Sequence, residues 1–259
     1  MKSKYPIVLV HGIALKDFKF FRCFGGIEKK LKKEGYAVYN AKVDGFGSIE
    51  NNAEQLKDFV NGVLAESGAE KVNLVAHSKG GLDSKYMISK LGMENSVASL
   101  TTLCTPHKGS QVATKIYGLP NPLKKFIAFW VNLWYRIFGD KHPDALTVCR
   151  QLQSVKDVEE ETFGFSGKVY CQSYSAVLKR SRDDFLMGIP LIFSRRWEKD
   201  GSDGLVSVGA SKFGEYKGHV SEDSISHSEI TGFSASKKKR EKVYAFYLKL
   251  CEDLSERGF

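Results

Sequence analysis

The stretch that decides the fold is Val72-Asn73-Leu74-Val75-Ala76-His77-Ser78-Lys79-Gly80-Gly81. Its apolar first half predicts a buried strand, and the residues from Gly80 to Leu91 predict a helix. A serine between a strand and a helix, with small residues two positions before and after it, is the pattern of a nucleophile elbow. Ala76 and Gly80 meet that steric requirement. We therefore expect Ser78 to be a nucleophile; the alternative is an ordinary loop in which the serine caps the helix.

Outward from this turn, strand-like and helical stretches alternate. Strands are predicted at 7–10, 37–43, 72–75 and 97–103, and helices at 19–34, 51–65 and 80–91. This order is typical of βαβ units and predicts an α/β fold with a mostly parallel central sheet and helices on both faces. After Pro106 the alternation breaks, and residues 107–160 are predicted to form an inserted helical cap or lid. Further strands are expected at 169–174 and 205–208, and a last helix at 237–255. The 259 residues suit a single domain, 1–259.

A second motif, Val8-Leu9-Val10-His11-Gly12-Ile13, ends another apolar run. Active sites of open α/β sheets lie at the carboxyl edge of the strands, where this motif and the serine turn would meet. An oxyanion hole needs two backbone N–H donors that are already aimed at the reacting oxygen. We expect these donors to be the N–H groups of Ile13 and Lys79. A tight turn without that role is the alternative for His11-Gly12.

Four segments together resemble the bacterial triacylglycerol lipases of the Pseudomonas/Burkholderia type, which are α/β-hydrolases. They are Tyr5-Pro-Ile-Val-Leu-Val-His-Gly, Val72-Asn-Leu-Val-Ala-His-Ser-Lys-Gly-Gly, Thr105-Pro-His-Lys-Gly-Ser110 and Ser202-Asp-Gly-Leu-Val206. The resemblance covers most of residues 5–110 and 200–233 and is poor elsewhere. It implies hydrolysis of carboxylic esters of acylglycerols through an acyl-enzyme, with a Ser-Asp-His triad.

The base and the acid of that triad follow Ser78 in the order Asp or Glu, then His. The resemblance places the base at His227, in Ile225-Ser-His-Ser-Glu229, with His219 as a surface alternative. It places the acid at Asp203, at the edge of the strand predicted over 205–208. Asp200 is the runner-up for the acid, and Asp183 and Asp184 are more distant options. His77 is expected to point away from the serine hydroxyl.

Residues 117–138 hold seven aromatic side chains, and their helical spacing leaves only a narrow polar stripe. A helix that is apolar nearly all round is either buried or apolar on its outer face. One interpretation is therefore a buried cap helix. The other is a mobile lid that shields the acyl pocket in water and docks on lipid when it opens.

The net charge is +9, which favours a polyanionic partner such as nucleic acid or an acidic lipid surface. Residues 1–35 hold nine Lys or Arg against three Asp or Glu, and residues 108–142 hold six against one. We interpret this surplus as a cationic rim around an apolar lid that contacts anionic lipid transiently. Nucleic acid is excluded as a partner because no helix-turn-helix, RNP-type or zinc pattern accompanies the charge.

No signal peptide and no transmembrane segment are visible in the sequence. We expect a cytoplasmic protein, or a secreted one represented without its signal peptide. The five cysteines are odd in number and widely spaced, without CxxC, and they are expected to be free thiols. No cofactor is required for the expected chemistry. The resemblance implies a structural calcium near the base, for which Glu229 would be one ligand, Phe233 a backbone ligand, and Asp183 or Asp184 the upstream acid.

A phospholipase or an acyltransferase would use the same triad and remains an alternative. A protein of a different class, which binds lipid without catalysis on a hydrolase scaffold, is the second alternative.

Overall fold

The computed structural model describes residues 2–13, 23–153, 167–194, 200–233 and 235–259. Its centre is a six-stranded sheet in the order β2-β1-β3-β4-β5-β6. The strands are β1 (Ile7–Val10), β2 (Val38–Asn40), β3 (Val72–His77), β4 (Val97–Leu103), β5 (Tyr170–Ser175) and β6 (Glu215–His219). Every neighbouring pair is parallel. The predicted parallel sheet with helices on both faces is confirmed.

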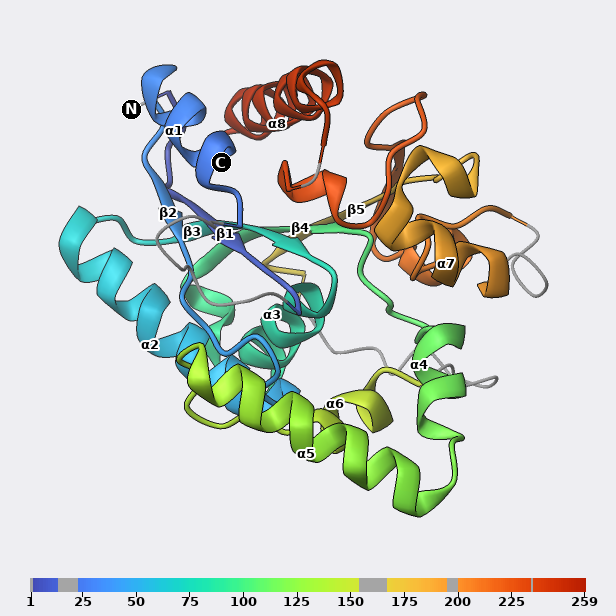
Figure 1. The fold of residues 1–259 in the computed structure, drawn as a ribbon. Helices are drawn as coiled ribbons and strands as arrows, with labels where there is room; N and C mark the ends of the chain where they lie inside the picture. Colours follow the sequence, from blue (N-terminus) through green and yellow to red (C-terminus); the bar gives the residue numbers. More distant parts are fainter. Residues whose placement is uncertain (1, 14–22, 154–166, 195–199, 234) are drawn as a thin grey trace.

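Helices cover the two faces of this sheet (Figure 1). On one face lie α1 (Gly25–Lys33) and α8 (Lys237–Glu256), and on the other lie α2 (Ile49–Ser67) and α3 (Lys79–Lys90). Strand β1 shows why helices must cover both faces of the sheet. Its side chains alternate, so that Ile7 and Leu9 pack into the core under α1 and α8, whereas Val8 and Val10 pack into the core under α2.

Two predicted elements differ from the structure. The helix predicted over 19–34 is described only from Gly25, since residues 14–22 lie outside the described chain. The strand predicted at 205–208 is wrong. There the carboxylate of Asp203 accepts hydrogen bonds from the backbone N–H groups of Leu205 and Val206, which bends the chain into a loop. The sixth strand is instead β6, which is rich in polar residues and partly exposed.

Between β4 and β5 the chain forms α4 (Gln111–Tyr117), α5 (Asn121–Ile137) and α6 (Ala145–Gln151). These helices fall within the predicted cap, whose residues 154–160 lie outside the described chain. Helix α7 (Phe185–Ser194) follows β5. Short 3₁₀ turns occur at Met93–Asn95, Ser181–Asp183, Gly209–Ser211 and Glu229–Thr231. In the described part of the chain, no helix is long and apolar enough to cross a bilayer.

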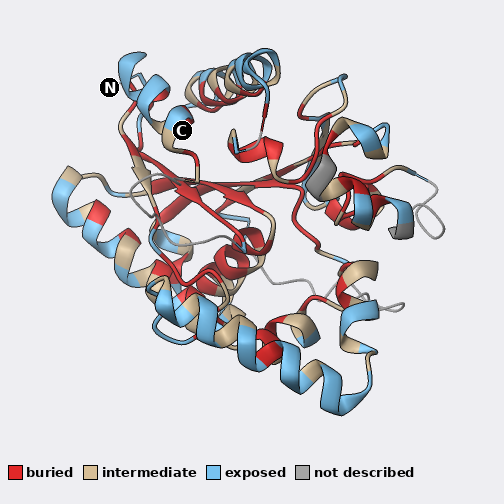
Figure 2. Cartoon of the chain, viewed as in Figure 1, coloured by how far each residue is buried: buried red, intermediate tan, exposed pale blue. Residues whose placement is uncertain are grey.

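Helix α5 exposes most of its apolar side chains to solvent (Figure 2). Phe126, Phe129, Trp130 and Trp134 are each more than half exposed, and Ala128 is the buried residue of the helix. Of the two interpretations of this segment, the buried cap helix is therefore wrong.

The end of α5 is tied to the loop after β2 by two buried carboxylates. Asp44 accepts hydrogen bonds from the backbone N–H groups of Lys141 and His142 at 3.0 and 2.8 Å. In return, Asp140 accepts from those of Gly45 and Phe46 at 3.0 and 2.8 Å. Because each segment supplies both a carboxylate and two donors, this reciprocal clasp fixes the C-terminal end of α5 to the body of the molecule.

Candidate active site

Ser78 stands at the turn between β3 and α3 with a backbone φ of 54° and ψ of −132°. This conformation is strained for a residue with a side chain, and such strain concentrates at functional sites. Two glycines allow the close packing around it. A Cβ on Gly80 would lie 2.4 Å from the carbonyl oxygen of His11, and one on Gly12 would lie 3.0 Å from the Ser78 hydroxyl. The predicted elbow geometry is therefore present, and β1 approaches the serine directly.

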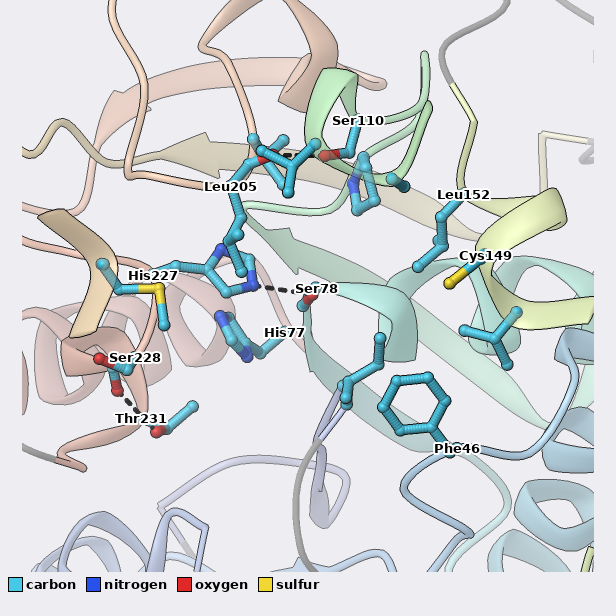
Figure 3. Close-up of a pocket in the computed structure, with 18 of the residues that line it drawn as sticks. Phe46, His77, Ser78, Ser110, Cys149, Leu152, Leu205, His227, Ser228 and Thr231 are labelled. Atoms are coloured by element: carbon cyan, nitrogen blue, oxygen red, sulfur yellow. Dashed lines mark hydrogen bonds between the residues drawn. The ribbon is translucent and has the colours of Figure 1, made fainter. Parts of the chain in front are cut away.

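His227 and Asp203 extend from the Ser78 hydroxyl as a hydrogen-bonded chain. Figure 3 shows the bond between His227 and Ser78. The distance from Ser78 Oγ to His227 Nε2 is 2.8 Å, and that from His227 Nδ1 to Asp203 Oδ2 is 2.7 Å. A carboxylate only accepts, so Nδ1 carries the proton and Nε2 is left free to accept the hydroxyl proton. The arrangement can activate the serine as a nucleophile.

Asp203 is completely buried, and each of its two carboxylate oxygens accepts at least one hydrogen bond. Oδ1 accepts the N–H groups of Leu205 and Val206 at 2.9 and 2.8 Å, while Oδ2 faces His227. Burial, and after it the charge of Asp203, raises the pKa of the Cys104 thiol well above its usual range. The backbone N–H of His227 donates to the Asp203 carbonyl at 2.9 Å, which joins the two loops.

The other candidates for acid and base lie elsewhere. Asp200 accepts a hydrogen bond from the backbone N–H of Gly209, and Asp183 pairs with Arg180. Asp184 accepts from the hydroxyls of Ser226 and Ser228, on either side of the base, without touching the imidazole chain. His219 is exposed and hydrogen-bonded to Ser175.

The prediction for His77 concerns its direction relative to the Ser78 hydroxyl, and the structure shows where its ring packs. Its ring lies against that of His227, with 4.5 Å between centroids, and it lines the same cavity (Figure 3). Burial, and secondarily the charge of His227, hold the pKa of His77 well below its usual range. A neutral ring at this place supports the base without repelling an imidazolium. Position alone could not reveal this contact, because His227 is distant in the sequence.

The oxyanion-hole role of the N–H groups of Ile13 and Lys79 stays a prediction. Ile13 follows Gly12 beside the serine hydroxyl, and Lys79 is the first residue of α3. The side chain of Lys79 turns inward instead, where its ammonium pairs with Asp83 at 2.7 Å. Burial raises the pKa of Asp83 to about 6, although the lysine opposes that shift. This ion pair anchors the start of α3, and the signal for it in the sequence is the spacing of two opposite charges four residues apart at the predicted helix.

An apolar cavity of about 540 Å³ opens above the serine. Ser78 and His227 lie in its wall, together with apolar side chains from α4, α6 and the loops around them. Residues that line it include Phe46, Val112, Ala113, Ile116, Val148, Cys149, Leu152 and Leu205. Its size and lining suit a small apolar ligand.

The expected calcium ligands do not fit that ion. Both oxygens of Glu229 accept from the ammonium of Lys239 at 2.8 Å, and Oε2 also accepts the Ser226 N–H at 3.0 Å. Asp184 is engaged by two serine hydroxyls. Calcium needs six to eight oxygen ligands, and an ammonium at this carboxylate would repel it. Over the described ranges, no cluster of three or more His, Cys, Asp or Glu side chains is arranged for a metal.

Comparisons with known proteins agree with this geometry. The model of the family described as palmitoyl protein thioesterase matches residues 6–160. Triacylglycerol lipase 2 of Saccharomyces cerevisiae is 28% identical over 262 residues, which cover 90% of this chain and 73% of that protein. A triacylglycerol lipase of Burkholderia plantarii is 38% identical over 168 residues, or 60% of this chain and 46% of that protein. The resemblance seen in the sequence is thereby confirmed.

Two solved structures share the fold. A metagenomic carboxyl esterase superposes with a TM-score of 0.74 at 16% identity, covering 98% of this chain and 77% of the other. The mature form of a Bacillus licheniformis lipase superposes with a TM-score of 0.68 at 22% identity, covering 96% and 92%. At these identities the likeness concerns the architecture of the sheet and its helices.

Proposed function

Because the chain belongs to the palmitoyl protein thioesterase family and is a carboxylic ester hydrolase with the α/β-hydrolase fold, we propose that Ser78, Asp203 and His227 form its catalytic triad. The observation that carries this proposal is the hydrogen-bonded chain from Ser78 through His227 to Asp203, with distances of 2.8 and 2.7 Å, in the wall of an apolar cavity.

In the proposed mechanism, Ser78 Oγ attacks the carbonyl carbon of the ester while His227 Nε2 takes the hydroxyl proton. The carboxylate of Asp203 holds the Nδ1 proton and stabilises the imidazolium. The N–H groups of Ile13 and Lys79 receive the oxyanion. The ester C–O bond then breaks, and the leaving alcohol takes the proton from Nε2. Water, activated by the same imidazole, hydrolyses the acyl-enzyme and restores the serine.

We propose acylglycerols as the substrate class. The cavity is lined mainly by apolar side chains, which suits an acyl chain, and the curated relatives above carry the name triacylglycerol lipase. We further propose that residues 107–160 act as a cap on the single domain 1–259. Its helices α4 and α6 line the cavity, and the exposed aromatic face of α5 would contact lipid.

We propose that calcium has no structural role here, because the ammonium of Lys239 lies where such an ion would have to bind Glu229. A chelator such as EDTA should leave both activity and melting temperature unchanged. A loss that added calcium restores would contradict this proposal.

The triad is tested with a fluorophosphonate probe and a panel of substrates. The wild type should be labelled and Ser78→Ala should not, and hydrolysis of p-nitrophenyl esters should fall by a factor on the order of 10⁶ in that variant. Emulsified triglyceride, phospholipid and a palmitoyl thioester, each with and without an added alcohol, distinguish a lipase from a phospholipase, a thioesterase and an acyltransferase. A wild type that is neither labelled nor active would leave only a lipid-binding role.

The choice of acid is tested with a matched pair of variants. Asp203→Asn should lower kcat about 10⁴-fold, because the amide favours the wrong imidazole tautomer. Asp200→Asn, only three residues away in an exposed loop, should change kcat less than threefold. The reverse result would assign the acid to Asp200.

A further inference from the structure

A second apolar cavity, of about 150 Å³, lies under α5. Three side chains line both this cavity and the one above Ser78, namely Phe46, Ile116 and Cys149. The two spaces therefore share a wall. The second cavity is otherwise lined by Tyr117, Leu119, Lys124, Ile127, Ala128, Val131, Ala145 and Leu146.

Two helices run from one cavity to the other. Along α4, Val112 and Ala113 line the first cavity, Ile116 lines both, and Tyr117 lines the second. Along α6 the order reverses. Leu152, just past its end, and Val148 line the first cavity, Cys149 lines both, and Leu146 with Ala145 lines the second. Residues three or four apart share one face of a helix, so each helix presents a continuous apolar strip from the serine to the space beneath α5.

We propose that the second cavity is an extension subsite for the distal part of a long acyl chain, which passes between Phe46, Ile116 and Cys149. This proposal rests on the proposed function, since it requires the acyl carbonyl at Ser78. Burial raises the pKa of the Cys149 thiol, so that at neutral pH an uncharged side chain borders this passage.

The volume sets the length of chain that the subsite would take. An apolar cavity of about 150 Å³ stays dry and accommodates benzene, so this one would hold about six carbons of a chain. Each methylene moved from water into apolar surroundings strengthens binding about fourfold. The enzyme should therefore prefer long saturated acyl chains to short ones, and the preference should depend on residues that line the second cavity alone.

Ala128→Phe tests the subsite, because Ala128 is buried and lines only the second cavity. We expect kcat/KM for p-nitrophenyl butyrate to stay within twofold and that for the palmitate ester to fall at least tenfold. Val131→Phe should act in the same direction. Because Val131 is only partly buried, the fold accommodates the larger phenylalanine side chain more easily there. Ala65→Phe, on the exposed surface of α2, is the matched control and should change neither value.

Melting temperature and fluorophosphonate labelling are recorded for each variant. An unchanged chain-length profile in variants that fold and label would overturn the subsite and leave the triad intact. An equal loss on short and long esters in both variants would also overturn it, because the substitution would then act on the whole cap. Failure of the wild type to label would instead contradict the proposed function itself.

Discussion

At the scale of single residues, the strained Ser78 and the glycines around it were predictable, whereas the partners of the base were not. The requirement for small residues at positions 76 and 80 is local and steric, so five consecutive residues reveal it. The packing of His77 on His227, and the influence of Asp203 on the pKa of Cys104, join residues far apart in the chain. Only the folded arrangement of the loops creates those contacts.

His107 provides a prediction on pH. Its ring stacks on Phe213 and bonds Thr102, and burial holds its pKa well below the ordinary 6.5. The unfolded chain binds a proton below pH 6.5 that the folded state resists, so this contribution to stability is present above pH 6.5 and is lost as the pH falls. Below pH 6.5, His107 lowers the free energy of unfolding by about 1 kcal/mol per pH unit, until the pKa of His107 in the folded state is reached.

We expect His107→Gln to flatten the acid-side slope of the free energy of unfolding between pH 6.5 and 5. Urea titrations at a series of pH values measure this slope. His142→Gln, at an exposed site, should keep the slope of the wild type. If His107→Gln also keeps it, proton uptake at His107 does not contribute to acid unfolding.

At the scale of elements, the sequence predicted those whose pattern is set by burial. Strands β1, β3 and β4 are buried along their whole length and rich in apolar and β-branched residues, and α2 and α8 carry apolar stripes, so their existence follows from the sequence pattern. The segment 205–208 is also apolar, yet it forms a loop because the carboxylate of Asp203 captures its N–H groups. Side-chain capture of this kind overrides an apolar pattern and leaves no periodic signal.

The link between α8 and the loop of the base gives a prediction at this scale. Lys239, in the first turn of α8, neutralises Glu229, which holds the N–H of Ser226 next to His227. Lys239→Met leaves a buried carboxylate unpaired and should cost about 1–3 kcal/mol of stability. It should also lower kcat about tenfold with little change in KM, because the base is displaced while the cavity is untouched.

Lys238 lies on the same turn and is exposed, so Lys238→Met is the control and should behave as the wild type. Lys239→Arg should recover most of the kcat, since a guanidinium also pairs with the carboxylate. A Lys239→Met protein with wild-type kcat and melting temperature would show that this ion pair does not position the loop.

At the scale of the whole molecule, the structure bears on part of the expected cationic rim, because Lys16, Lys19 and Arg22 lie outside the described residues. The basic residues of α1 lie with α8 on one face of the sheet, whereas α5 lies beyond the opposite face (Figure 1). Among the described basic residues, those of α1 and those of the cap therefore lie on different sides of the sheet. Charge counted along a sequence cannot reveal this division, because it depends on which face each crossover covers. The basic residues of the cap belong to the same segment as the exposed aromatic face of α5.

This division predicts which charges matter at a lipid surface. Replacing Lys125, Arg136 and Lys141 by Gln should abolish any preference for vesicles that contain anionic lipid over neutral vesicles, since each basic residue near the surface contributes about 1 kcal/mol. Replacing Lys29, Lys30 and Lys33 of α1 removes equal charge from the other side and should leave the preference intact. Vesicle sedimentation measures both. Equal losses would indicate attraction by net charge alone.

The reciprocal clasp of Asp44 and Asp140 determines how α5 could move. A helix of 17 residues is about 25 Å long, and this one is fixed at its C-terminal end. If α5 rotates as a rigid body about the clasp, a rotation of about 10° displaces its N-terminal end by about 4 Å and its C-terminal end hardly at all. Opening would be greatest beside α4, and smallest where the loop after β2 meets the cavity.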